Sequence, residues 1–455
     1  MKIIIAGAGK IGFSVAQILA AEGHDITVID RDPNRIYETS NSLDVICVEG
    51  SGTNPETLIE AGAAEADLLV AATRDDEINM VCGISAKSLG TKQVIARIRD
   101  TDYLRQTDFL RRALGLSYII NPEYECAKEI SRMLRFPGAN RVCAFSAGSL
   151  EMAEHRVAAG SRLDGMCLKD LPASFGAKVL VSMVQRGDEA IIPNGRFVLR
   201  ADDLLEVAGD NAQLRKFFAS AGMLGDPVKN VMLMGGGRIA VYLAQLLMEN
   251  GMSVSIMEND RARCDELCDS VPGARVICGD GTKGEVLLEE GLRNTDAFVA
   301  LTGDDGSNIV TSMYAKNCAV GKIVVKVNRE YYSDILHTAG LDSLVTPKAL
   351  VAQQLARYVR AMSNSQGSSM ETLYRLAEGQ VEALEFVVNE NSRCVGLPLK
   401  LLRIRPNVLI AALVRNGATI IPNGETVISP GDHAVIIAKA GWLKNMDDVI
   451  DEVGV

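Results

Sequence analysis

The chain opens with an isoleucine run that leads directly into glycines: Ile3-Ile4-Ile5-Ala6-Gly7-Ala8-Gly9-Lys10-Ile11-Gly12. The apolar run predicts a buried strand, and the residues after the glycines have the pattern of a helix. In such a unit the first glycine permits a tight turn, the second lets a pyrophosphate approach the backbone, and the third lets the helix pack on the strand. The helix N-terminus then holds the phosphates. The stretch therefore predicts a nucleotide-binding, Rossmann-like fold.

The same pattern returns half a chain later, as Val231-Met232-Leu233-Met234-Gly235-Gly236-Gly237-Arg238-Ile239-Ala240. Ala240 replaces the third glycine, and alanine is accepted there because this position only has to pack closely. The alternative for either copy is a packing turn in an α/β sheet beside a degenerate, empty pocket.

Each loop is followed by a predicted strand that ends in an acid, Asp30 in the first copy and Glu258 in the second. A carboxylate there accepts hydrogen bonds from ribose hydroxyls and would repel a 2′-phosphate. NAD or an adenine nucleotide is therefore favoured over NADP, although Arg31 weakens that preference. Glu258 is longer than Asp30, so we expect the ribose of the second copy to be displaced.

Further matches show that the whole chain is a tandem repeat. Residues 72–79 match 301–308, a spacing of 229 residues, and the same spacing relates the remaining two pairs: Gly50-Ser51-Gly52-Thr53 with Gly279-Asp280-Gly281-Thr282, and Ile191-Ile192-Pro193-Asn194-Gly195 with Ile420-Ile421-Pro422-Asn423-Gly424. A constant spacing across unrelated motifs indicates a duplication.

Each repeat divides again, because strands alternating with helices give way to short strands alone. We predict an α/β fold with Rossmann-like doubly wound parallel sheets over 1–137 and 228–363, each followed by a small α+β domain, over 138–224 and 370–455. We expect Phe136-Pro137-Gly138 to end the last helix of the first sheet domain. In the first small domain we expect a hairpin whose turn is Pro193-Asn194-Gly195. Residues 363–369 are predicted to be a flexible linker or exposed loop.

Several polar residues follow other predicted strands and would meet at the carboxyl edge of each sheet. The Gly-Ser-Gly-Thr and Gly-Asp-Gly-Thr segments follow the third strands, and Thr73 and Thr302 follow the fourth. Arg97 and Lys326 end the fifth strands, where a cation could reach phosphates or form a structural ion pair. We expect Asp76 and Asp305 to cap helices.

Composition excludes several classes of protein. The chain has 455 residues, 47 % of them apolar, and a net charge of −11. This charge disfavours binding to nucleic acid or directly to anionic lipid. No apolar run is long enough to span a bilayer, and no secretory signal is recognisable, so we expect a cytosolic protein with its ten cysteines reduced.

Catalytic groups are not recognisable. The four histidines, His24, His155, His337 and His433, share no spacing between the repeats, and no metal-ligand cluster or serine-elbow motif is present. The small domains show no repeated titratable pair. We therefore predict a protein that is not an enzyme, with no catalytic residues and no metal site.

The chain resembles the TrkA family, the regulatory subunits of Trk potassium-uptake systems, which carry tandem RCK (regulator of potassium conductance) domains. The resemblance covers the whole chain. It rests on the first glycine-rich loop with Asp30, on residues 66–73, on Ile95-Ala96-Arg97-Ile98-Arg99 and on the Ile191–Gly195 segment, in the family's order and spacing.

This resemblance implies a cytoplasmic regulator, peripheral to the membrane, that forms a homo-oligomeric ring beneath a potassium-translocating membrane subunit of the TrkH or TrkG type. NAD(H), ATP or ADP would bind the two clefts and gate transport by changing the ring's shape. In the first repeat it assigns the nucleotide to Gly7, Ala8, Gly9, Lys10, Ile11, Gly12, Asp30, Ser51, Gly52, Thr73, Arg74 and Arg97. In the second it assigns Gly235, Gly236, Gly237, Arg238, Ile239, Glu258, Asp280, Gly281, Thr302, Gly303 and Lys326.

The repeats differ at Ser51 against Asp280 and at Arg74 against Gly303, so the two clefts could prefer different nucleotides. Two alternatives stay open at this point. One is an NAD-dependent oxidoreductase, and the other is a structural adaptor with vestigial pockets.

Overall fold

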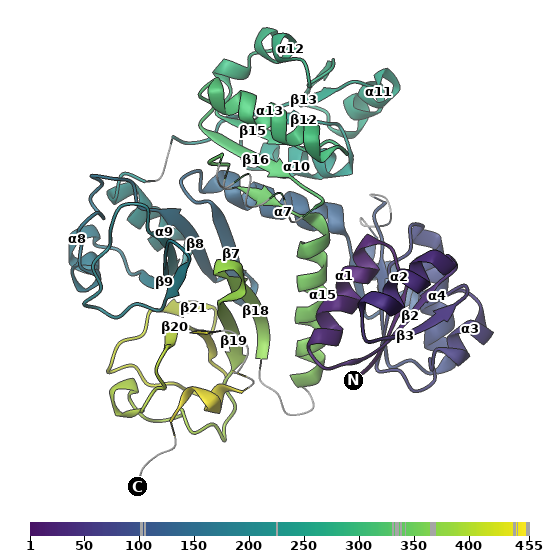
Figure 1. The fold of residues 1–455 in the computed structure, drawn as a ribbon, viewed down its shortest axis with the longest axis horizontal. Coiled ribbons are helices and arrows are strands. Elements are labelled where there is room, and N and C mark those ends of the chain that lie inside the picture. Colours follow the sequence, from purple (N-terminus) through teal and green to yellow (C-terminus); the bar gives the residue numbers. More distant parts are fainter. Residues whose placement is uncertain are drawn as a thin grey trace. The chain divides into compact units, whose positions relative to one another are not determined.

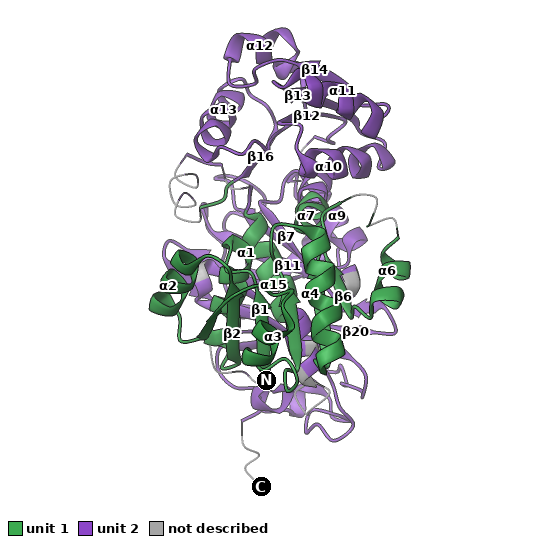
Figure 2. Cartoon of the chain, turned by 90° about the vertical axis from the view of Figure 1, so that its right-hand side faces the viewer, with its two compact units in different colours: residues 1–128, 327–330, 346–356 green, residues 129–326, 331–345, 357–455 purple. Residues whose placement is uncertain are grey.

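The computed structural model describes residues 1–100, 106–223, 226–329, 343–364, 370–439 and 445–451, with isolated positions at 103, 332, 336, 339–341 and 443. These residues form two compact units (Figure 2). Unit 1 comprises 1–128, 327–330 and 346–356, and unit 2 comprises 129–326, 331–345 and 357–455. Of the predicted linker, residues 365–369 lie outside the described residues, as does His337.

Unit 1 contains a parallel sheet with the strand order β3-β2-β1-β4-β5-β6 (Figure 1). Its strands are β1 Lys2–Ala6, β2 Asp25–Asp30, β3 Ile46–Glu49, β4 Leu68–Ala71, β5 Gln93–Arg97 and β6 Tyr118–Ile120. Its helices are α1 Lys10–Ala21, α2 Pro33–Ser42, α3 Pro55–Glu60, α4 Asp76–Leu89, α6 Thr107–Leu114 and the start of α7 Pro122–Arg135. Ile3, Ile4 and Ile5 are each at most 2 % exposed, as expected for a central strand covered on both faces.

The equivalent sheet of the second repeat lies in unit 2 and has the order β14-β13-β12-β15-β16-β17. Its strands are β12 Asn230–Met234, β13 Ser253–Glu258, β14 Arg275–Cys278, β15 Ala297–Ala300, β16 Lys322–Lys326 and β17 Leu344–Val345. Its helices are α10 Arg238–Glu249, α11 Arg261–Ser270, α12 Gly284–Glu289, α13 Asp305–Asn317 and α15 Pro347–Asn364, part of which belongs to unit 1. Two doubly wound parallel sheets were predicted, and both are present.

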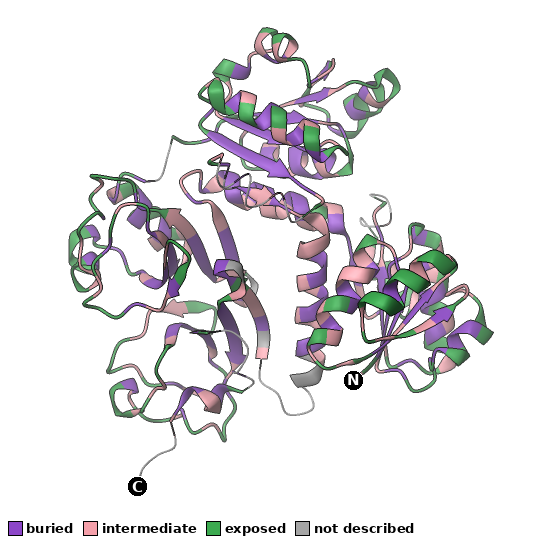
Figure 3. Cartoon of the chain, in the orientation of Figure 1, coloured by how far each residue is buried: buried purple, intermediate pink, exposed green. Residues whose placement is uncertain are grey.

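The two small domains, also in unit 2, are built on antiparallel sheets. The first has the order β10-β9-β11-β8-β7, from β7 Arg141–Phe145, β8 Leu150–Arg156, β9 Leu180–Arg186, β10 Glu189–Ile191 and β11 Leu204–Gly209, with helices α8 Leu171–Phe175 and α9 Asn211–Ser220. The second has the order β18-β19-β22-β20-β21, from β18 Met370–Leu376, β19 Val381–Val387, β20 Val408–Arg415, β21 Ala418–Ile420 and β22 His433–Lys439. Figure 3 shows most of these strands buried.

The predicted position of the hairpin turn is wrong. β9 and β10 are joined by Gly187 and Asp188, with Arg186 paired to Glu189. The predicted segment instead leads into a separate turn beyond β10, in which the Phe197 amide donates to the Asn194 carbonyl at 3.0 Å. In the second repeat the corresponding turn is Asn416-Gly417, and both residues have positive φ, 52° and 78°. Two-residue hairpin turns favour such residues, so the Asn-Gly pair was the better signal.

The two small sheets share one apolar core in unit 2. Its buried residues come from both sheets, including Phe145, Leu150 and Met152 from the first and Val381, Val435 and Ile437 from the second. Polar contacts add to it: Ser146 Oγ donates to Glu385 Oε1 at 2.5 Å, and Thr419 Oγ1 donates to the Ser149 carbonyl at 2.7 Å. The small domains of the two repeats are therefore packed as an intramolecular pair.

An ion pair is repeated in the small domains, contrary to the expectation that they have no such pair. Arg186 donates two hydrogen bonds of 2.7 Å to Asp203, and Arg415 donates two of 2.7 Å to Asp432. Both aspartates are 1 % exposed. Their partners lie 17 residues away, beyond the intervening loop, so the pairs join parts of each domain that no local pattern connects.

These pairs predict an acid-sensitive stability. Burial alone would raise the pKa of Asp203, but hydrogen bonds from Arg186 and from the Arg200 amide outweigh this effect, so the pKa lies below the ordinary 3.8. The pKa of Asp432 is lowered in the same way, by hydrogen bonds from Arg415 and from the Ser429 amide. A lowered folded pKa means that the stabilisation is present above the unfolded value and is lost as pH falls through the folded one. We expect Asp203→Asn to lower the free energy of unfolding by about 2 kcal/mol at pH 7.

The measurement is the urea midpoint of the full chain between pH 3 and pH 7. The difference in unfolding free energy between the original chain and Asp203→Asn should narrow as the pH drops below about 4, because the unfolded chain then binds a proton at Asp203 that the native carboxylate, with its lower pKa, does not yet bind. Asp226→Asn, at an exposed position, is the control. A gap that is the same at every pH would contradict the charge-based account.

Candidate functional site

In each parallel sheet the direction of winding reverses beside the first strand, and we call this switch point the crevice of the sheet. β1 lies between β2 and β4, and β12 lies between β13 and β15. Loops that leave neighbouring strands toward opposite faces separate at such a point, which is where nucleotides bind in doubly wound folds. The glycine-rich loops follow β1 and β12, so both lie at these crevices.

The first loop needs its glycines for steric reasons. Gly7 has a φ of 110°, and a Cβ there would lie 3.0 Å from the backbone of Ala72. A Cβ on Gly12 would lie 1.8 Å from the Gly7 carbonyl oxygen. At Gly9, by contrast, the nearest atom to a Cβ would be Arg35 Nη1, at 3.9 Å. The space in front of Gly9 is therefore open, as a pyrophosphate site requires.

The second loop repeats this arrangement. Gly235 has a φ of 103°, and a Cβ there would lie 3.1 Å from the Thr302 nitrogen. A Cβ added to Gly237 would meet no described atom within 4 Å, and Ala240 is fully buried in α10. The first residues of the following helices are Lys10 and Ile11 in α1 and Arg238 and Ile239 in α10.

The acid after each second strand binds its own glycine-rich loop. Asp30 Oδ2 accepts from the Ala8 amide at 2.6 Å, and Glu258 Oε2 accepts from the Gly236 amide at 2.7 Å. The other oxygens accept from the amides of Asp32 at 3.0 Å and of Asn259 at 2.8 Å. A carboxylate has about four acceptor positions, so ribose hydroxyls can still be accommodated.

The ends of the third strands differ in charge. Ser51 Oγ accepts from Arg31 Nη2 at 2.9 Å, so the first cleft presents a hydroxyl and a guanidinium here. In the second cleft Asp280 accepts from the Thr282 hydroxyl at 2.7 Å and from the Thr282 amide at 3.0 Å, and these two bonds lower the pKa of Asp280. Gly52 and Gly281 pack against the ends of β1 and β12.

A buried asparagine that the sequence analysis did not assign to the site connects the fourth and fifth strands. Asn79 Oδ1 accepts from the Thr73 amide at 2.8 Å and its hydroxyl at 2.7 Å, and Asn79 Nδ2 donates to the Arg97 carbonyl at 2.8 Å. Asn308 makes the same bonds to Thr302 and to the Lys326 carbonyl, at 3.0, 2.7 and 3.0 Å. Asn79 and Asn308 are separated by the spacing of the repeat, and this recurrence is the feature of the sequence that could have assigned them to the site.

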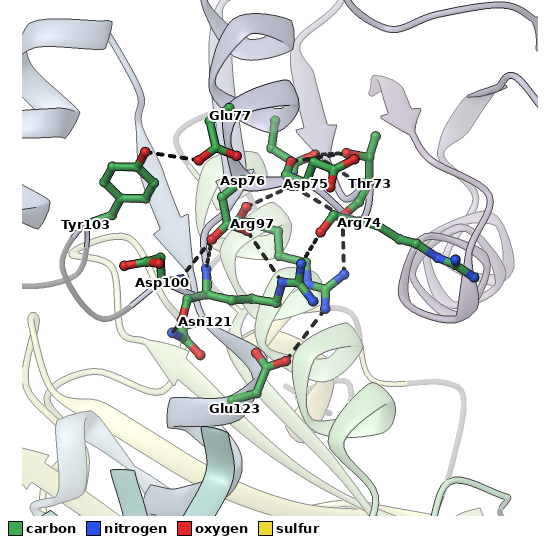
Figure 4. Close-up of polar contacts among 12 residues, drawn as sticks. Thr73, Arg74, Asp75, Asp76, Glu77, Arg97, Asp100, Tyr103, Asn121 and Glu123 are labelled. Atoms are coloured by element: carbon green, nitrogen blue, oxygen red, sulfur yellow. Dashed lines mark hydrogen bonds and ion pairs between the residues drawn. The ribbon is translucent and has the colours of Figure 1, made fainter. Parts of the chain in front are cut away.

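The cations of the fifth strands bond to the backbone of the same crevice. Arg97 Nη1 donates to the Thr73 carbonyl at 3.3 Å, and its Nη2 lies 3.8 Å from Glu123 Oε1 (Figure 4). Lys326 Nζ donates to the Thr302 carbonyl at 2.6 Å. The Arg74 side chain points away from this cluster in Figure 4, and Gly303 has open space at its Cβ position.

The expectation that Asp76 and Asp305 cap helices is wrong. The N-cap residues are Asp75 in α4 and Asp304 in α13, where Asp304 accepts from the Ser307 amide at 2.7 Å. Asp76 is buried and accepts from the amides of Arg99 and Asp100, both at 2.8 Å. It therefore shapes the backbone that follows β5.

His155 and His433 each contact another group of the protein outside the two crevices. The Nδ1 of His155 lies 2.6 Å from the Gly138 carbonyl, and burial lowers the pKa of this histidine. His433 Nδ1 lies 3.1 Å from Glu385. Within the described ranges, no group of three or more metal-ligating side chains is gathered, and no helix is both long and apolar enough to cross a bilayer.

The chain matches protein-family models over most of its length. The TrkA-N domain model matches residues 3–122 and 231–347, and the TrkA-C domain model matches 152–222 and 383–448. The Trk system potassium uptake protein TrkA homolog of Archaeoglobus fulgidus is 32 % identical over 450 residues, which cover 99 % of this chain and 100 % of the relative. This chain belongs to the TrkA family.

A second relative is the Trk system potassium uptake protein TrkA of Vibrio alginolyticus, 31 % identical over 96 % of this chain and 95 % of its own. These TrkA relatives are named as potassium-uptake proteins and not as enzymes, which agrees with the prediction of a non-enzymatic chain.

Solved structures support the fold. The GsuK RCK domain aligns with a TM-score of 0.61 at 20 % identity, over 96 % of this chain and 92 % of that one. The GsuK channel bound to NAD aligns with the same score and identity, over 96 % of this chain and 77 % of that one. The architecture is therefore that of tandem RCK domains.

Substitutions at two glycines of the first loop should affect different properties, stability at Gly12 and nucleotide binding at Gly9. Gly12→Ala should lower the free energy of unfolding by about 1–3 kcal/mol, because its Cβ overlaps a backbone oxygen. Gly9→Ala should fold normally, since Gly9 has φ −70° and ψ −179°, which alanine adopts, but its methyl group should weaken nucleotide binding about tenfold. Thermal melting and calorimetric titration measure the two effects. Equal destabilisation by both variants would contradict this assignment.

Proposed function

We propose that this chain is the nucleotide-sensing regulatory subunit of a Trk-type potassium-uptake system. The observation that carries the proposal is the pair of open glycine-rich crevices in a chain of the TrkA family. A sensor needs a ligand site whose occupancy changes the protein, and the repeated glycine-rich loop with its acid supports two candidate sites of this kind. The loops, acids and strand-end residues named for the two clefts above are proposed as their nucleotide ligands.

The proposed ligands are NAD(H), ATP and ADP. Two solved relatives in fold are named as GsuK bound to NAD and GsuK bound to ADP. In this chain Asp30 and Glu258 favour a nucleotide whose 2′-hydroxyl is unmodified, because a carboxylate repels a 2′-phosphate. The differing charges at Ser51 and Asp280 lead us to propose different nucleotide preferences for the two clefts.

The proposed partner is a potassium-translocating membrane subunit of the TrkH or TrkG type, contacted at the cytoplasmic face of the membrane by a homo-oligomeric ring of this chain. The net charge of −11 disfavours direct attachment to anionic lipid, so a protein partner would hold the ring there. Within each chain we propose the four domains at the limits predicted from the sequence.

Gating by a nucleotide requires that it bind one conformation of the ring more tightly than the other. A differential affinity of about 1–3 kcal/mol is typical of allosteric proteins. We propose that the two conformations differ at the edge of each crevice after β4 and β15, where Asn79 and Asn308 bond to Thr73 and Thr302.

The proposal predicts that NADH, ATP or ADP raises the melting temperature of the full chain, because a ligand that binds only the folded state stabilises it. A nucleotide at 100 times its Kd should add about 2.7 kcal/mol. Combining Gly9→Ala with Gly237→Ala should roughly halve the stabilisation at the same concentration, to about 1.4 kcal/mol, because a tenfold weaker affinity leaves the nucleotide at ten times its Kd. If none of the three nucleotides raises the melting temperature, the chain is not a sensor of them.

A second measurement separates a sensor from an adaptor. In cells that depend on this chain, the rate of potassium uptake should differ between the original chain and the variant that combines Gly9→Ala with Gly237→Ala. Unchanged uptake, with the variant folded and present at the normal level, would support an adaptor with vestigial pockets.

A further inference from the structure

Arg97 contacts both the first crevice, through the Thr73 carbonyl, and helix α7, through Glu123. The side chains of Arg97 and Glu123 are only 13 % and 18 % exposed, and they form an ion pair with 3.8 Å between Nη2 and Oε1. The second carboxylate oxygen, Glu123 Oε2, is buried with no hydrogen-bond partner among the described residues. Figure 4 shows Glu123 directed at the Arg97 guanidinium, beside Thr73.

Glu123 is the second residue of α7. This helix begins directly after β6, with the Tyr124 amide donating to Asn121 Oδ1 at 2.8 Å, and it continues to Arg135, shortly before the first small sheet begins at Arg141. A change in how Glu123 is held therefore acts on the first turn of the segment that connects the nucleotide domain to the small domain.

A phosphate in the crevice would compete with this carboxylate. A guanidinium binds phosphate and carboxylate oxygens with the same paired geometry, and a guanidinium group that bonds to one of them is less available to the other. The ion pair at 3.8 Å is longer than a hydrogen bond, so little direct hydrogen bonding is lost when it breaks. The mostly buried Glu123 carboxylate would then lack a compensating charge, so Glu123 has to move when Arg97 changes partner.

We propose that Glu123 is a positioning residue for Arg97, and that Arg97 exchanges Glu123 for a nucleotide phosphate when the first cleft is occupied. The exchange releases the first turn of α7 and so reports occupancy along the chain. This inference rests on the proposed function, since it requires a nucleotide in the first cleft.

The second repeat lacks this device. Lys326 takes the place of Arg97, and Lys348, the second residue of α15, takes the place of Glu123. Two lysines cannot form an ion pair with each other, and Lys326 donates instead to the Thr302 carbonyl. Occupancy of the second cleft is therefore not transmitted through its following helix by this route.

Hydrogen–deuterium exchange of the full chain, measured by mass spectrometry during titration with ADP and with NADH, tests whether Arg97 replaces Glu123 with a nucleotide phosphate. Peptides over residues 7–12 report binding in the first cleft, and peptides over 122–135 report the state of α7. In the original chain, protection of 7–12 should coincide with faster exchange in 122–135.

In Glu123→Gln, which keeps the size of the side chain and removes its charge, exchange in 122–135 should be fast without nucleotide and should not respond to it. Protection of 7–12 should then need roughly three- to tenfold less nucleotide, because the competing carboxylate is gone. Glu123→Asp should retain the response, and Lys348→Gln is the matched control in the second repeat, which should behave like the original chain.

Protection of 7–12 with no change in 122–135, in the original chain and in Glu123→Gln alike, would overturn this inference and leave the proposed function standing. An absence of protection at both 7–12 and 235–240 with either nucleotide would count against the proposed function itself.

Discussion

The hydrogen bond from the second residue of each glycine-rich loop to the acid at the end of the next strand holds both clefts in shape. It joins Ala8 to Asp30 at 2.6 Å and Gly236 to Glu258 at 2.7 Å. Charge-assisted bonds of this kind are roughly twice as strong as neutral ones. With the loop fixed on that side, Gly9 and Gly237 face open space, and the helix N-termini are available to an anion.

The duplication has kept the framework of the site and changed its charged surroundings. Asn79 and Asn308 make the same bonds in both repeats, so the ends of the fourth and fifth strands are held alike. The positions that would touch or sense a ligand differ in charge, as with Ser51 against Asp280. The small domains of the two repeats, by contrast, share one apolar core.

The sequence predicted the two parallel sheets and the position of each loop, because the signals are local: an apolar run, glycines, and an acid at the end of the next strand. It failed where long-range partners decide the outcome. The Arg186–Asp203 pair, the Asp76 bonds to the backbone after β5 and the Arg97–Glu123 contact join residues from separate elements. The hairpin turn was predicted wrongly for another reason. Pro193-Asn194-Gly195 has the composition of a turn, but the strands are joined at the nearby two-residue turns Gly187-Asp188 and Asn416-Gly417.

The claim that both crevices are nucleotide sites is tested most directly by counting bound ligand. Equilibrium dialysis of the full chain against labelled NADH, ATP and ADP measures the number of nucleotides bound per chain at saturation. The account predicts two, one in each cleft, when the preferred nucleotide of each cleft is supplied. A chain that binds none of the three at millimolar concentration would contradict it.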